Sequence, residues 1–316
     1  MIRRRPLLAG MMAGACAPAL AAPPRQMTLV TGGAADSPAD IAARSFAPFL
    51  ERHLPRIRVE VENRPGAAGV VAYRRVASAP ADGTVLGWVS TPALPARCIE
   101  LGDRSLMRRL LLLGTVAKEP IAIVAPATES LRTMADLMRV AASEPVAVTA
   151  PGSPAYLAAL RLQHITGVPF DLLTFPTGTA VRQATASGNV AAGILPLSEA
   201  AAGLREEHLV PLGVASLKAE AFPDWPTLVD QGIRLSAWIY RGVAAPSGLP
   251  AARVARIGAA LQSAVADPEF QAQSDGDGIL PYYISGQDWA ERIAAEEAEI
   301  ARLWSIRPWR TDRATG

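Results

Sequence analysis

Two serine–proline pairs mark the positions of this sequence that are best suited to hold a small anion. Ser37–Pro38 lies in a segment at 31–40 that is rich in glycine, alanine and serine and leads into a helix. Ser153–Pro154 lies at the end of a second such loop at 150–154. In each loop the serine fits the N-cap position and the proline fits the first helical position. The free N–H groups of a helix start carry partial positive charge, so two such starts facing each other could bind one anion. Each pair taken alone is also consistent with an ordinary helix start.

Residue combinations that could carry catalysis are few. The chain has three histidines, His53, His164 and His208, and none has a partner at a metal-binding spacing. The sequence contains no G-x-S-x-G nucleophile elbow. Asp36 and Asp40 lie four residues apart and could form a carboxylate pair, but no nucleophile or metal ligand accompanies them. We therefore expect no enzyme activity, no cofactor and no metal.

The elements that must position these loops alternate between strand and helix. Short apolar runs alternate with helix-length amphipathic segments, which is typical of a mostly parallel sheet covered by helices. In such α/β sheets, ligands bind at the carboxyl ends of the strands, where loops lead into helices. We expect strands at 27–31, 57–62, 84–89, 112–116, 121–124, 146–149, 171–175, 190–195, 209–215 and 239–244. We expect helices at 38–53, 131–142, 154–166, 180–187, 251–266, 268–275 and 286–304.

The first residues have the layout of a secretory signal peptide. Three arginines at 3–5 precede an apolar run at 7–22 that ends in small residues. This run is shorter than the roughly 20 apolar residues of a membrane span, and Pro18 interrupts it. We expect cleavage after Ala21, which makes 1–21 the signal peptide. The arginines fit both ordinary Sec export and twin-arginine export.

Charge, cysteine content and length narrow the function classes further. The 316 residues carry a formal net charge of +2, and removal of the signal peptide with its three arginines and no acid leaves −1. We therefore expect no nucleic-acid binding, which would need a clustered basic face. Cys98 is then the only cysteine, which excludes an internal disulfide and a thiolate metal site. A mature chain of roughly 290 residues exceeds the usual size of one domain, which favours two lobes.

One segment gives more specific information about the kind of protein than these general patterns do. It reads Asn63-Arg64-Pro65-Gly66-Ala67-Ala68-Gly69, with Asp40-Ile41-Ala42-Ala43-Arg44 before it and Ala81-Asp82-Gly83-Thr84 after it. In this order the segments resemble the Bug family, the extracytoplasmic receptors of tripartite tricarboxylate transporters. Further segments that match the family lie at 166–168, 175–178, 222–228, 240–243 and 245–248. Each motif alone is weak, whereas the ordered set covers nearly the whole mature chain.

The resemblance implies a periplasmic-binding-protein-like α/β fold, a Venus flytrap of two α/β lobes joined by two crossing strands. Lobe 1 would comprise 22–124 and 239–316, and lobe 2 would comprise 125–238. It implies a periplasmic solute-binding protein that captures a small organic acid, a di- or tricarboxylate or a related compound, and delivers it to the membrane permease of a tripartite transporter. We expect a monomer. The family's ligand loops, carried over onto this chain, point to nine ligand-binding residues: Ala35, Ser37, Asp40, Ser90, Thr91, Gly152, Ser153, Thr177 and Gly178.

Several positions leave alternatives open. Asp40 either contacts the ligand or, because it would repel a carboxylate, accepts backbone N–H bonds in the first turn of its helix. Arg241 could face the ligand or form a salt bridge at the hinge. Leu195–Pro196 replaces an Asp-Asn pair that is common in the family, which favours a less charged or more apolar acid than citrate. The same fold would also suit a ligand-binding co-receptor of a membrane sensor kinase or, less readily, an enzyme acting on a small acid.

Overall fold

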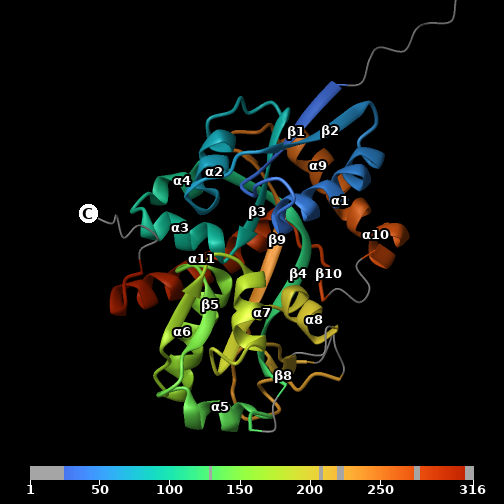
Figure 1. Cartoon of the computed structure of the whole chain (residues 1–316). Helices are drawn as coiled ribbons and strands as arrows, with labels where there is room; N and C mark the ends of the chain where they lie inside the picture. The colour runs from blue at the N-terminus through green and yellow to red at the C-terminus, as the bar shows by residue number, and fades with distance from the viewer. Residues whose placement is uncertain (1–24, 128–129, 206–208, 219–223, 274–277, 310–316) are drawn as a thin grey trace, which may run out of the picture.

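The computed structural model describes residues 25–127, 130–205, 209–218, 224–273 and 278–309 of the chain. The predicted signal peptide, His208 and parts of the segments at 222–228 and 268–275 lie outside these ranges. The described strands form a ten-stranded sheet that extends through two lobes (Figure 1).

Lobe 1 contains the N-terminal strands and the C-terminal helices. Its strands are β1 (Arg25–Thr31), β2 (Ile57–Asn63), β3 (Val85–Thr91), β9 (Trp238–Pro246), β10 (Leu280–Pro281) and the first half of β4 (Leu110–Pro126). Its helices are α1 (Pro38–Arg52), η1 (Ala67–Gly69), α2 (Val70–Ala77), α3 (Ala93–Glu100), α4 (Arg104–Arg108), α9 (Ala251–Val265), α10 (Pro268–Gln273) and α11 (Gly286–Ile306). β1 is parallel to β2 and β3, whereas β9 is antiparallel to both β3 and β4.

Lobe 2 is built from the middle of the chain. Its strands are β5 (Val146–Thr149), β6 (Leu172–Phe175), β7 (Ala192–Pro196), β8 (Leu209–Val214) and the second half of β4. Its helices are α5 (Met134–Val140), α6 (Pro154–Thr166), α7 (Gly178–Ala186) and α8 (Leu197–Arg205). β5 is parallel to β6 and β7, and β4 is antiparallel to β7 and β8.

The two lobes are joined by β4 and β9, which run side by side from one lobe toward the other (Figure 1). The sequence predicts two separate strands at 112–116 and 121–124, and this prediction is wrong because β4 is continuous. The polar pair Lys118–Glu119 looks like a break between two apolar runs. In the structure, successive side chains of the strand point to opposite faces, and each finds a partner there. The Glu119 carboxylate is bound by Arg241, and the Lys118 ammonium lies 4.3 Å from the centre of the Trp238 ring.

The helix starts follow the predicted capping chemistry. Ser37 caps α1 by accepting a hydrogen bond from the Asp40 N–H at 3.3 Å, and Ser153 caps α6 by accepting one from the Tyr156 N–H at 3.2 Å. Both predicted N-caps are therefore confirmed. Thr177 caps α7, so that helix begins at Gly178, two residues before the predicted start. The sequence patterns also miss short elements that depend on packing, namely α2, α3, α4, α8 and β10.

The apolar core is divided between the lobes, except that α3 contributes Ala96 and Ile99 to the cluster of lobe 2 and that α11 is shared between both lobes. Trp289 and Ile293, in the first half of that helix, pack into lobe 1. Ile300 and Leu303, in its second half, belong to the buried cluster of lobe 2 together with Leu157 of α6. Helix α11, like α3, therefore contributes to both cores and holds the lobes together.

Candidate ligand-binding cleft

A cavity of about 940 Å³ lies between the two lobes. The loop before α1, α1 itself and α10 line it from lobe 1, and the starts of α7 and α8 line it from lobe 2. The crossing strands contribute Val116, Ala117 and Arg241. The cavity is therefore placed as the predicted two-lobed fold requires, with wall residues from both lobes and from the strands that join them.

Arg241 is anchored at the crossing strands by a buried acid. Its Nη2 donates to Oε1 of Glu119, whose side chain is completely buried. The other carboxylate oxygen of Glu119 accepts a hydrogen bond from the Ser198 hydroxyl at 2.6 Å and one from the Ser198 backbone N–H at 3.3 Å. The Nη1 of Arg241 is also buried, and it has no hydrogen-bond partner among the described residues. Arg241 thus forms the salt bridge that was one of its two predicted roles, and it also lines the cavity, while contact with a ligand stays a prediction.

Glu199 lies against the first residue of α7. A Cβ atom at Gly178 would lie 1.2 Å from Oε2 of Glu199, so only glycine allows this approach. Burial raises the pKa of Glu199, and the charge of Glu119 raises it further, whereas Arg241 and Arg182 oppose the shift. Oε2 of Glu199 is buried and accepts no hydrogen bond within the described part of the chain.

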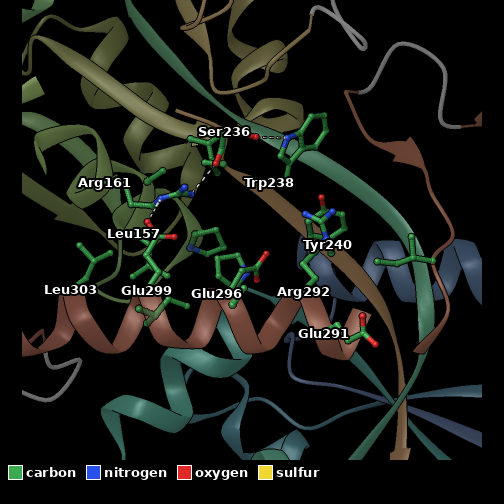
Figure 2. Close-up of a pocket in the computed structure, with 18 of the residues that line it drawn as sticks. Leu157, Arg161, Ser236, Trp238, Tyr240, Glu291, Arg292, Glu296, Glu299 and Leu303 are labelled. Atoms are coloured by element: carbon green, nitrogen blue, oxygen red, sulfur yellow. Dashed lines mark hydrogen bonds and ion pairs between the residues drawn. The ribbon is translucent and has the colours of Figure 1, made fainter. Parts of the chain in front are cut away.

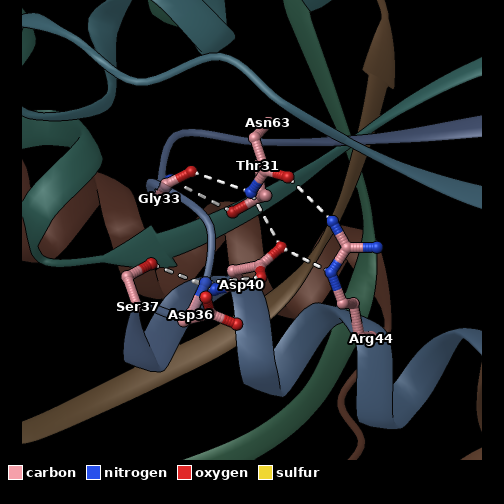
Figure 3. Close-up of polar contacts among 7 residues, drawn as sticks. All are labelled: Thr31, Gly33, Asp36, Ser37, Asp40, Arg44 and Asn63. Carbon is pink, nitrogen blue, oxygen red and sulfur yellow. Dashed lines mark hydrogen bonds and ion pairs between the residues drawn. The ribbon is translucent and has the colours of Figure 1, made fainter.

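The loop before α1 is held in shape by Asp40 (Figure 3). This carboxylate is 2% exposed and accepts hydrogen bonds from the Asp36 N–H at 3.0 Å and from Nδ2 of Asn63 at 2.7 Å. The hydrogen bond from Arg44 is the main cause that lowers the pKa of Asp40. Asn63 also donates to the Gly33 carbonyl at 3.0 Å. Asn63, the first residue of the Asn63–Gly69 motif, therefore links this loop to α1. The contacts of Asp40 support the interpretation that its carboxylate accepts hydrogen bonds within the protein.

Four of the nine predicted ligand residues line the cavity, namely Ala35, Ser37, Thr177 and Gly178. Ala35 and Ser37 come from the loop before α1, and Thr177 and Gly178 form the start of α7 in lobe 2. The structure thus brings the starts of α1 and α7 to one cavity, whereas the sequence pairs the start of α1 with that of α6.

The other five predicted residues, Asp40 among them, have contacts elsewhere. Ser90 forms a hydrogen bond with Tyr73, and Thr91 accepts one from Nε1 of Trp289 at 3.2 Å. The backbone of Gly152 is covered by Trp309, whose Nε1 would lie 2.7 Å from a Cβ at that position. Ser153 does not line the cavity. Its hydroxyl accepts a hydrogen bond at 2.8 Å from the hydroxyl of Thr149, which does line it. Ligand contact by these five residues stays a prediction that the cavity does not support.

Of the charged residues that line the cavity, Arg182 and Glu199 are not singled out in the sequence, whereas Asp36 and Arg241 are named there outside the predicted ligand set. Glu199 follows β7 by three residues, so it obeys the rule that functional side chains lie just beyond the carboxyl ends of strands. The Leu195–Pro196 pair indicates that the chain departs from the family pattern at this place, but it does not indicate the acid that follows. Arg182 lies in the first turns of α7, and no motif in the sequence distinguishes it from other surface arginines.

A second cavity of about 610 Å³ also lies between the lobes, beside α11 (Figure 2). Trp238 and Tyr240 of β9 line it, together with Arg161 of α6 and Glu296 of α11. Arg161 donates to the Ser236 carbonyl at 2.8 Å, just before β9, and its ion pair with Glu299 at 2.8 Å joins α6 to α11. Burial raises the pKa of Glu296 to about 7.

The described ranges contain neither a metal-binding cluster nor a membrane-spanning helix. No group of three or more histidine, cysteine or acidic side chains within them could hold a metal ion. His53 lies 3.6 Å from Asp267, and His164 lies 3.4 Å from Arg302. None of the described helices is both long enough and apolar enough to cross a membrane.

Comparison with known families assigns the chain. The model of the tripartite tricarboxylate transporter family receptor matches residues 43–306. The protein belongs to this receptor family. The predicted family is thus confirmed, and its members are solute-binding receptors rather than enzymes. Among curated relatives, the UPF0065 protein in the gbd 5' region of Cupriavidus necator is 27% identical to this receptor over 294 residues, which cover 89% of this chain and 88% of that protein.

Solved structures confirm the predicted fold of the receptor. The periplasmic binding protein BugD matches it with a TM-score of 0.76 at 21% identity, over 90% of this chain and 98% of that one. MatC from Rhodopseudomonas palustris, solved with bound malate, matches with a TM-score of 0.75 at 23% identity, over 88% and 98% of the two chains. An R. palustris protein solved with adipate matches with a TM-score of 0.76 at 21% identity, over 89% and 96%. The two-lobed α/β architecture is therefore that of periplasmic binding proteins.

Proposed function

We propose that this receptor captures a small organic acid in the cavity between its lobes, in the periplasm, and delivers it to the membrane permease of a tripartite tricarboxylate transporter. The observation that carries this proposal is the position of Arg241. Its guanidinium is anchored by Glu119 on one side, and on the other it has a buried N–H group with no partner among the described residues. A guanidinium binds carboxylates through directional, charge-assisted hydrogen bonds.

Three further observations support the proposal. The starts of α1 and α7 lie at the cavity, and helix starts favour negatively charged groups. Two proteins of the same fold were solved with the carboxylic acids adipate and malate. The arginines at 3–5 and the apolar run after them favour export of the protein. We infer that the acid bridges the two lobes and that the receptor acts as a monomer.

Binding to the mature protein tests this proposal. We expect mono- or dicarboxylates to raise its melting temperature, because a ligand that binds only the native state stabilises that state. We expect Arg241→Gln to weaken binding by about 100-fold, since truncating one partner of a buried charge pair costs several kcal/mol. The matched control is Arg132→Gln, an exposed arginine of lobe 2 that does not line the cavity. A protein that responds to a sugar or a cation and to no acid would contradict the proposal.

A further inference from the structure

Charges around the interlobe cavity do not favour a ligand with several carboxylates. Arg182 and Arg241 line the cavity, but so do the acids Asp36 and Glu199. One guanidinium nitrogen of Arg241 is already bound by the buried Glu119. A di- or tricarboxylate would therefore meet no excess of positive charge, and charge complementarity is what normally selects such ligands.

Glu199 would repel a second ligand carboxylate at one particular place in the cavity. Its carboxylate lies against the backbone of Gly178, at the start of α7, where the helix end would otherwise attract a ligand anion. Burial and the neighbouring Glu119 both raise its pKa, which indicates a poorly solvated carboxylate. A second ligand carboxylate placed here would put two like charges together with little water to screen them.

The same cavity offers one unsatisfied acceptor and one unsatisfied donor. The acceptor is Oε2 of Glu199 and the donor is Nη1 of Arg241, and neither has a hydrogen-bond partner within the described ranges. The two groups are close enough that the charge of Arg241 affects the pKa of Glu199. Buried polar groups are costly unless they are paired, so a ligand that satisfies both would gain most.

We propose that the cavity selects a monocarboxylate that also carries a hydrogen-bond donor, either a hydroxyl or an ammonium group. The ligand carboxylate binds Arg241 and the donor binds Glu199. The carbon chain between them contacts the apolar part of the lining, where Ile41, Phe270 and Ile279 lie. This assignment rests on the proposed function, because it names the class of acid for the same cavity. Glu199 is the residue that determines specificity.

Isothermal titration of the mature protein with two matched series of acids tests the assignment. The four-carbon series is butanoate, 4-hydroxybutanoate, 4-aminobutanoate and succinate, and the six-carbon series is hexanoate, 6-hydroxyhexanoate, 6-aminohexanoate and adipate. Within a series only the group at the far end changes. We expect the hydroxy or amino acid to bind at least about tenfold more tightly than the unsubstituted acid or the dicarboxylate, because unpaired buried groups and like charges penalise the other two. The tighter of the two distinguishes a hydroxyl from an ammonium ligand.

Replacement of Glu199 should reverse the preference for the far group. In Glu199→Gln the acceptor charge is lost and the amide can donate, so we expect the dicarboxylate to gain at least about tenfold and the amino acid to lose a similar factor. Glu144→Gln is the matched control, because Glu144 is an exposed acid of the same lobe that does not line the cavity, and we expect no change of preference.

The outcomes separate this inference from the proposed function. If acids bind but the wild type prefers the dicarboxylate, or if Glu199→Gln leaves the order of affinities unchanged, the inference is overturned and the receptor function stands. If no acid binds the wild type or the variants, both fail. Should Glu199→Gln not fold, the order of affinities in the wild type decides on its own.

Discussion

The two faces of β9 illustrate how one strand can serve two different purposes. Arg241 points into the cavity beside α7 and α8, whereas Trp238 and Tyr240 point into the cavity beside α11. The side chains of the neighbouring strand β4 are divided between the same two faces. Glu119 joins Arg241, and Lys118 lies over the rings of Trp238 and Tyr282. Alternation along the strands thus separates an ionic face from an aromatic one.

The ionic face lies at the cleft and is called the cleft face here, and the aromatic face lies beside α11 and is called the α11 face. The difference between them indicates where the lobes separate. On the α11 face, Ile300, Leu303 and Trp309 are buried in the cluster that also holds Leu157 of lobe 2. Charged side chains line the cavities on both faces, but on the cleft face no buried apolar cluster of the described residues takes members from both lobes. Apolar burial is lost when a packed contact opens, whereas charged groups can be hydrated. We expect the cleft face to open for the ligand while the α11 face stays packed.

The largest expected effect is on the ionic face. Glu119→Ala would leave the guanidinium of Arg241 without its buried partner, and breaking a buried ion pair in this way costs about 3–5 kcal/mol. We expect this loss in the free energy of unfolding from urea titration. Glu144→Ala, at an exposed acid of lobe 2, serves as the control. A loss below about 1 kcal/mol would place this pair with weak surface ion pairs.

The next largest effect is on the aromatic face. Trp309 is 3% exposed, and its ring packs edge-on against Trp304, with 4.9 Å between ring centres, and against Tyr156 of α6. Trp309→Ala should lower the free energy of unfolding by about 3 kcal/mol, because removal of a buried tryptophan leaves a cavity. Trp309→Phe should recover more than half of the loss. Equal stability of Trp309→Ala and the wild type would show that this ring adds nothing to the packing between α6 and α11.

A smaller, pH-dependent effect is expected at Glu296. Burial raises its pKa to about 7, so the folded protein favours the protonated carboxyl while the unfolded chain is ionised above its ordinary value near 4.5. This group therefore lowers stability progressively as the pH rises from about 4.5 to 7, and the penalty is complete above pH 7. Glu296→Gln should be more stable than the wild type by about 1–2 kcal/mol at pH 8 and equally stable at pH 4. A variant that is destabilised equally at both pH values would contradict the burial of this charge.

The smallest effect is expected at the ion pair between α6 and α11. Arg161 and Glu299 lie 2.8 Å apart, but both side chains are partly exposed. Glu299→Ala should therefore cost less than about 1 kcal/mol, and added salt should reduce the difference. Thermal unfolding at low and high ionic strength measures both quantities. A salt-independent loss of several kcal/mol would mean that this pair, and not apolar packing, closes the α11 face.

Patterns in the sequence predict the fold better than they predict the cavity. The caps Ser37 and Ser153, the alternation of strands and helices and the two lobes all follow from local chemistry or from the ordered motifs. The continuity of β4 does not, because Lys118 and Glu119 are stabilised by partners far away in the chain. The short helices α3 and α8 likewise depend on tertiary packing, since helices of this length are marginal by themselves.

Within the cavity, proximity in space is the information that the sequence lacks. Thr177 and Gly178 could be placed by their position after β6, and the structure puts them in the wall. Gly152 could be placed by the same rule, but Trp309 from the far end of the chain covers it. The sequence does not indicate Glu199, because its importance comes from its approach to Gly178, which depends on how α7 and α8 pack.

The order of strands in the sheet has a consequence for how the chain reaches its native state. β3 and β4 follow each other in the chain, but β9 lies between them, and Thr91 of β3 pairs with Tyr240 of β9. During synthesis the N-terminal strands are complete long before the strand that must join them. Pairings of such long range close large loops and slow folding. We expect the N-terminal segment to expose an unpaired sheet edge until β9 emerges, which gives chaperones time to engage an incompletely folded chain.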